Sequence, residues 1–230
     1  MNVLQQVATL IGKDLRIEGR TRQTLGLVLV LGILIISVLG LGLNMTSATA
    51  AMGTPAILWV AYLFAGVLCF EKTMGVERQD GALAGLLLAP IDRGVIFASK
   101  LIGNLLLMFA VAAVITPVGI LFFNFDLSPP QLGRIAPLGF VAIMALSMLG
   151  FAAVGTLFSA MVSSTRLQGG LLAMVVFPLV LPLVIASTQM ITALFRDGTR
   201  PGGTGLAILL AFDAIFLAAS WIVFELVLEP

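Results

Sequence analysis

Reactive side chains are scarce in this chain of 230 residues. It has no histidine, and it has one cysteine, Cys69, and one tyrosine, Tyr62. Acid–base catalysis by histidine, a serine–histidine triad and a metal site built from several cysteines are therefore excluded within the chain. Cys69 lies in an apolar stretch, where a lone free cysteine usually packs as a small hydrophobic residue. The available residue types leave this chain little chemistry of its own.

Asp213 is an ionisable residue about halfway along a long apolar stretch, residues 204–224. An ionised group at that depth in a membrane-spanning helix costs at least about 2.5–3.5 kcal/mol, so it is expected to face other helices or a cavity. Two interpretations remain open. Asp213 is either a functional intramembrane group, such as a proton or sodium site, or a structural group that pairs with a polar group of another helix or lies at a shallower depth.

Charge is concentrated in one segment of the chain. Seven of the 23 charged residues lie between Glu71 and Arg93. Within this segment, residues 82–89 form a short apolar stretch that Asp80 could cap as a helix and that Pro90 would end. A helix of two turns is not stable alone in water and needs a surface that buries its leucines. That surface is either the lipid interface and the protein's own helices, or a groove on a partner protein.

The elements that carry these residues are predicted from composition. Hydrophobic residues make up 60% of the chain, charged residues make up 10%, and the mean hydropathy is +1.16. A soluble domain has roughly 45–50% apolar and about 25% charged residues. A soluble or disordered protein is therefore excluded. The long unbroken apolar runs favour membrane-spanning helices over alternating β-barrel strands.

The spacing of charges divides the chain into six predicted spans. Residues 23–70 hold no charge and are about twice as long as one span of roughly 20 residues, so they must hold two. The fold class is thus all-α integral membrane, a single transmembrane domain over residues 1–230, with residues 71–100 as a cytoplasmic loop. The six spans are placed near residues 24–43, 55–71, 101–125, 136–162, 169–195 and 204–224. Pro178 and Pro182 remove helix hydrogen bonds from the fifth span; they could shape a pathway or act as a hinge, and they could equally be static packing geometry.

Six spans place both termini on one side of the membrane. Nine of the twelve basic residues then lie on the side of the termini, which the positive-inside rule assigns to the cytoplasm. Residues 47–50 resemble a signal-peptide cleavage site, but the apolar stretch before them is longer than the roughly 7–15 residues of a signal peptide. The first span is therefore expected to be retained.

Residues 1–22 follow a different pattern. Leu4, Val7, Ile11 and Leu15 recur at helical spacing, and basic residues lie among the polar positions. This pattern predicts an amphipathic helix that lies in the membrane interface. A positively charged topology anchor is an equally good interpretation, and the two do not exclude each other.

The charged segment also carries a family resemblance. In order along the chain, the residues that carry it are Glu71, Asp80, Gly81, Leu83, Leu86, Leu87, Pro90 and Lys100. This pattern resembles the membrane subunit of the cytochrome c maturation haem exporter, the CcmB family, within the ABC-2-type permeases. A second patch, from Gln168-Gly169-Gly170 through Pro178 and Pro182, resembles the fifth span of the same family. Length and the layout of six spans agree with this resemblance over essentially the whole chain.

The resemblance implies a permease subunit without catalytic activity in the bacterial inner membrane. No G-x-x-x-x-G-K-[S/T] phosphate loop occurs in the sequence, so ATP must be bound and hydrolysed by a partner of the CcmA type. The implied assembly is a homodimer with two such ATPases, a CcmC-type haem-handling protein and a small accessory subunit. Its implied role is haem export or release of a haem-loaded CcmE-type chaperone.

The resemblance also assigns roles to residues. The implied ATPase contact consists of Glu71, Glu77, Arg78, Asp80, Gly81, Leu83, Leu86, Leu87 and Pro90. No cofactor, metal site or haem ligand is assigned, because histidine is absent and methionines on apolar helices usually serve packing. Two alternatives remain: an ABC-2 permease for another cargo, and an ion-coupled carrier that uses Asp213. A neighbouring gene for a Walker-motif ATPase would favour an ABC transporter over the carrier.

Overall fold

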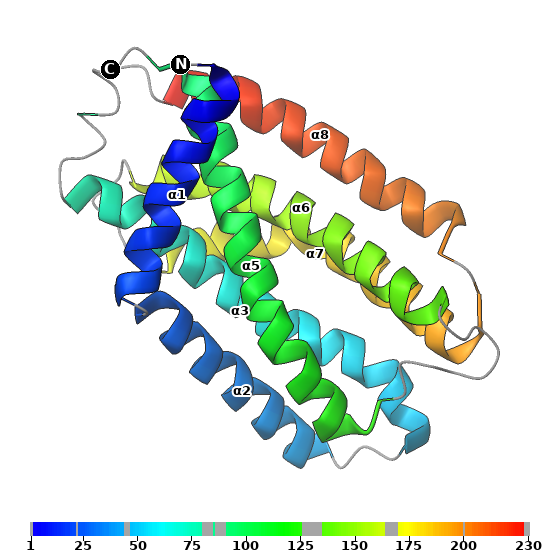
Figure 1. Ribbon diagram of the computed structural model, residues 1–230. Helices are drawn as coiled ribbons and strands as arrows, with labels where there is room; N and C mark the ends of the chain where they lie inside the picture. The colour runs from blue at the N-terminus through cyan, green and yellow to red at the C-terminus, as the bar shows by residue number, and fades with distance from the viewer. Residues whose placement is uncertain are drawn as a thin grey trace.

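The computed structural model describes residues 2–21, 23–43, 47–79, 85, 91–125, 135–163, 170–199 and 201–227. All regular secondary structure in this part of the chain is helical (Figure 1). The helices are α1 (Val3–Thr21), α2 (Gln23–Leu43), α3 (Ser47–Gln79), α5 (Arg93–Phe123), α6 (Ile135–Ser163), α7 (Leu171–Arg196) and α8 (Gly203–Val227). The six helices from α2 to α8 are each long and apolar enough to cross a membrane. The predicted fold class, an all-α membrane protein with six spans, is confirmed.

Helices α3 and α6 form the centre of the bundle. In each of them, 67% of the most apolar stretch is buried inside the protein, against 17–33% in the other four spans. Helices α2, α5 and α7 pack against α3, and α5, α7 and α8 pack against α6. Figure 1 shows α2 and α8 at opposite edges of the bundle. The four outer helices therefore carry most of the apolar surface that faces lipid.

Two phenylalanines and two glycines join α3 to α6 in a reciprocal contact. The ring of Phe70 on α3 lies against Gly155 on α6, and the ring of Phe151 on α6 lies against Gly66 on α3. The two ring centroids are 5.1 Å apart, with the planes inclined at 72°. A Cβ atom at either glycine would collide with the facing ring. Small residues therefore let the two central helices approach closely, as is common in membrane bundles.

The start of α1, the end of α3, the start of α5 and the end of α8 lie at one end of the bundle (Figure 1). We call this the charged end. At this end, Phe97 of α5 packs against α8. Its ring centroid lies 6.1 Å from that of Trp221 and 5.1 Å from that of Phe224. At the opposite end, Phe195 packs against Phe125 and Phe140.

Two helices extend beyond the spans predicted from the sequence. Helix α3 continues to Gln79, whereas the predicted span ended at residue 71, and α5 begins at Arg93, whereas the predicted span began at residue 101. Charged residues end the stretch that fits into lipid, but Glu, Lys and Arg are good helix formers and do not end a helix. Much of the segment 71–100, predicted as a loop, is therefore helical.

Candidate functional site at the charged end

Helix α1 is held on the bundle by an ion pair. Nζ of Lys100, near the start of α5, lies 2.8 Å from Oδ2 of Asp14 on α1, and Lys100 is only 4% exposed. Nζ of Lys13 lies 3.3 Å from Oδ1 of the same carboxylate. A buried ammonium group requires such a partner, because an unpaired charge away from water is costly. The pair therefore fixes α1 against α5.

A second acidic residue of α1 caps the next helix. Oε1 of Glu18 accepts a hydrogen bond of 2.9 Å from the backbone N–H of Leu25, in the first turn of α2. The first amides of a helix have no partner within the helix, and the helix dipole favours a negative charge beside them. Sequence reasoning missed both acidic contacts. The available signal was the spacing of Asp14 and Glu18, which are four residues apart and so share one face of α1.

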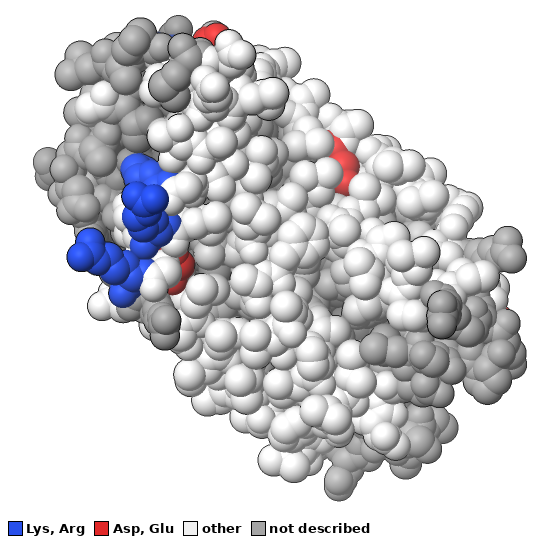
Figure 2. Space-filling model, in the orientation of Figure 1, with Lys and Arg blue, Asp and Glu red and all other residues white. Residues whose placement is uncertain are grey.

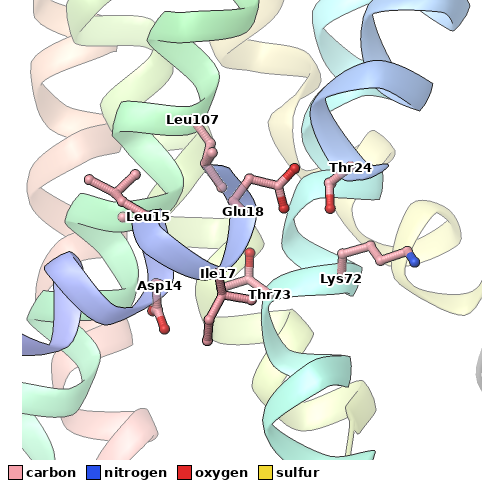
Figure 3. A pocket seen from close by; sticks show the side chains of 9 residues that line it. Asp14, Leu15, Ile17, Glu18, Thr24, Lys72, Thr73 and Leu107 are labelled. Carbon is pink, nitrogen blue, oxygen red and sulfur yellow. The ribbon is translucent and has the colours of Figure 1, made fainter. Parts of the chain in front are cut away.

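A small pocket lies between α1, α2, α3 and α5 (Figure 3). Its polar lining consists of Asp14, Glu18, Thr24, Lys72 and Thr73. The volume is about 60 Å³. A water molecule needs roughly 10–15 Å³ by this kind of measure, and ligand pockets span roughly 300–1,000 Å³. The pocket has room for a few water molecules but not for a haem-sized cargo.

Beneath the pocket, hydrogen bonds join three helices. The hydroxyl of Thr73 on α3 lies 2.8 Å from Oδ1 of Asn104 on α5, and Nδ2 of Asn104 donates to Oγ1 of Thr156 on α6 at 2.9 Å. Asn104 and Thr156 are fully buried. This chain runs from the charged end into the central pair of helices, and sequence reasoning did not find it. It links the end of α3 to α5 and α6.

Most of the predicted ATPase contact lies outside the described residues. Glu71 is half-buried on α3, and Glu77 and Arg78 belong to the last turns of α3, although the positions of their side chains are not described. The remaining predicted contact residues lie outside the described residues; they are Asp80, Gly81, Leu83, Leu86, Leu87 and Pro90. The coupling role of this segment therefore stays a prediction.

Asp213 lies in the interior of the bundle, on α8. It is 4% exposed. Its carboxylate lies against α6 at Gly150, which has no side chain, and Leu183 of α7 is close by. Neither carboxylate oxygen has a hydrogen-bond partner among the described residues. Two turns further along α8, Ser220 donates to the backbone carbonyl of Ala153 on α6 at 3.3 Å. Asp213 and Ser220 of α8 thus both turn towards α6.

The two prolines of α7 do not interrupt the helix. Helix α7 runs from Leu171 to Arg196 through both Pro178 and Pro182, and both prolines are exposed on its outer side. The buried side of α7 carries Ser187, whose hydroxyl accepts a hydrogen bond of 3.0 Å from Nε1 of Trp59 on α3. The prolines therefore face away from the centre of the bundle.

Residues that could hold a metal ion do not gather in one place. Within the described ranges, no group of three or more histidine, cysteine, aspartate or glutamate side chains meets. Cys69 is buried and free. The site at the charged end is accordingly an arrangement of ion pairs and hydrogen bonds that fixes helices relative to one another.

An all-helical bundle of six membrane spans defines a multi-pass membrane protein. The chain belongs to the CcmB protein family, whose model matches residues 5–226. It is 28% identical over 208 residues to "Heme exporter protein B" of Paracoccus denitrificans, covering 90% of this chain and 87% of that protein. It is 24% identical over 199 residues to the protein of the same name from Rhodobacter capsulatus, covering 86% and 84%. The resemblance inferred from the sequence is thereby confirmed, and the chain is a membrane permease by family.

Proposed function

We propose that this chain is the membrane subunit of an ABC transporter for cytochrome c biogenesis, and that a separate CcmA-type subunit hydrolyses ATP. The observation that carries the proposal is the family match over nearly the whole chain, with relatives named as haem exporters. In this assignment the complex exports haem or releases a haem-loaded CcmE-type chaperone. The chain acts as a homodimer beside a CcmC-type protein and a small accessory subunit.

The arrangement of α3 supports a route for the coupling. Helix α3 is central and runs unbroken from the charged end to the opposite end, so a displacement of its last turns would be carried along its length. The hydrogen bonds of Thr73, Asn104 and Thr156 would pass the displacement to α5 and α6. We assign the ATPase contact to the end of α3 and the segment that follows it, with the residues Glu71, Glu77, Arg78, Asp80, Gly81, Leu83, Leu86, Leu87 and Pro90.

Co-purification tests this contact. Replacing Asp80 and Gly81 by alanine, together with Leu86→Ala and Leu87→Ala, should abolish recovery of the ATPase with the tagged membrane subunit. The matched control replaces Asp197 and Leu138 by alanine, because both are exposed and lie towards the opposite end. Recovery of the ATPase at the wild-type level from the fourfold variant would overturn the assignment.

A genetic experiment tests the function itself. Deletion of the gene should remove c-type cytochromes from a haem-stained gel, and the wild-type gene should restore them. The fourfold variant should fail to restore them although it reaches the membrane at a normal level. Normal c-type cytochromes in the deletion strain would favour a permease for another cargo.

Asp213 supports one competing candidate, an ion-coupled carrier. The observation in its favour is a buried carboxylate for which the described residues offer no hydrogen-bond partner. Against it stands the family of the chain. Transport that continues without ATP or an ATPase subunit would favour the carrier.

A further inference from the structure

Helix α1 sorts its charges by face. Its acidic residues Asp14 and Glu18 turn towards the bundle, where they pair with Lys100 and cap α2. Its basic residues Lys13, Arg16 and Arg20 are spaced three and four residues apart, so they form one stripe along the helix. Figure 2 shows the Lys and Arg side chains of this face gathered beside α1. Lys13 pairs with Asp14 at 3.3 Å, so the outward positive charge of the stripe comes from the exposed Arg16 and Arg20.

The basic stripe borders a groove. The residues that line it include Thr9, Gly12, Lys13, Arg16 and Arg20. Gly12 leaves the groove open, since a Cβ atom there would meet no atom within 4 Å. Arg16 and Arg20 are exposed, and neither has an ion-pair partner among the described residues. Guanidinium groups bind phosphate oxygens in a bidentate manner, so the lining suits a phosphate.

Two observations place this groove beside the ends of membrane spans. Arg20 is three residues before Gln23, where the first span begins. The ion pair with Lys100 fixes Asp14 beside the point where the charge-free part of α5 begins. The stripe therefore lies at the level of lipid headgroups rather than in the aqueous phase. Ile17, which also lines the groove, is 42% exposed and can contact acyl chains.

We propose that this groove binds the phosphate of an anionic phospholipid headgroup. The lipid then holds α1 from its outer side, while the ion pair between Asp14 and Lys100 holds it from the inner side. The depth of the groove and the apolar side chains next to it favour a lipid over a free anion. Each basic residue near the membrane surface strengthens the binding of anionic lipid about fivefold.

Native mass spectrometry of the purified full-length protein tests the proposal. The protein in detergent is titrated with phosphatidylglycerol, and retained lipid is counted. The double variant Arg16→Gln with Arg20→Gln should bind roughly 30-fold more weakly, at about fivefold per basic residue. Arg196→Gln is the matched control, since Arg196 is exposed at the opposite end, and it should bind as the wild type does. Equal retention by the double variant and the wild type would overturn the proposal, as would an equal loss in the control.

Further arms identify the ligand and separate this proposal from the proposed function. Phosphatidylcholine should be retained much less than phosphatidylglycerol, and inorganic phosphate at millimolar concentration should not displace the bound lipid. Displacement by phosphate would identify a free-anion site and overturn the lipid assignment. Arg16→Lys with Arg20→Lys keeps the positive charge and should keep part of the binding. Loss of the ATPase with unchanged lipid binding would identify a protein contact instead. The lipid assay needs neither ATPase nor haem, so its result is independent of the transporter assignment.

Discussion

Asp14 and Lys100 are 86 positions apart in the sequence and 2.8 Å apart in space. Their contact decides where α1 lies, because Lys100 has little access to water and needs the carboxylate. The same carboxylate also pairs with Lys13. A single residue of α1 therefore holds together two basic groups at the membrane boundary.

Asp14→Asn should destabilise the protein strongly. Breaking a buried ion pair by removing one of its partners costs up to about 3–5 kcal/mol. The expected result is a lower thermal unfolding temperature in detergent and faster proteolysis within α1. Lys72→Gln serves as control, because Lys72 is exposed in the same region. Asp14→Leu combined with Lys100→Met should recover much of the loss, and failure to recover it would argue against an ion-pair effect.

Asp213→Asn should leave folding and cytochrome c maturation close to the wild-type level. Asparagine keeps the shape of the side chain and removes a charge for which the described residues supply no partner. Haem staining of c-type cytochromes and the yield of folded protein check this. A folded Asp213→Asn protein that fails to support maturation would show that the carboxyl group itself is used. Asp213→Leu separates the need for any polar group from the need for an acid.

At the scale of elements, the contact between α3 and α6 orients two helices that have no amphipathic pattern to orient them. Both helices are apolar on all sides over most of their length, so hydropathy alone does not orient them. Their relative position comes instead from the fit of Phe70 on Gly155 and of Phe151 on Gly66. Packing of this kind is a main source of helix association in lipid, where the surroundings are as apolar as the helix surface.

Gly155→Ala should therefore destabilise the bundle by about 1–3 kcal/mol, the usual cost of overpacking. The added Cβ atom meets the buried ring of Phe70, which has little room to move. Gly26→Ala is the control, since its Cβ atom would meet nothing within 4 Å, and its thermal stability should be unchanged or slightly higher. Equal stability of the two variants would contradict the close packing of α3 and α6.

At the scale of the whole molecule, the described chain begins and ends at the charged end, as six spans require (Figure 1). Lys13, Arg16, Arg20 and Lys72 lie towards this end, and Arg196 lies at the opposite end. The positive-inside rule then favours the charged end in the cytoplasm. This is also the side from which an ATPase would act.

Cysteine labelling tests the orientation. Cys69 is the only cysteine of the chain, so Cys69→Ala gives a background without thiols. In that background, Asp197→Cys should react with a membrane-impermeant maleimide in intact cells from which the outer membrane has been removed, whereas Gly19→Cys should react only after the cells are broken. Both positions are exposed. The reversed pattern would place the charged end outside and would contradict the proposed coupling.

The sequence by itself determined that this chain crosses a membrane six times, and its motifs identified the CcmB family. Both are local properties, because a run of about 20 apolar residues is sufficient to span a bilayer. Asp213 could be recognised as unusual in the same way. Even so, charges marked the ends of the lipid-embedded stretches and not the ends of α3 and α5.

Only the tertiary structure decided which helices are central and which distant residues meet. Asp14 meets Lys100, Thr73 meets Asn104, and Asp213 turns towards Gly150, and none of these contacts follows from hydropathy. The physical reason is that a membrane-spanning helix is apolar on its lipid side and on its protein side alike. The pattern that shows the buried face of a soluble helix is therefore missing, and side-chain fit and polar pairing decide the arrangement.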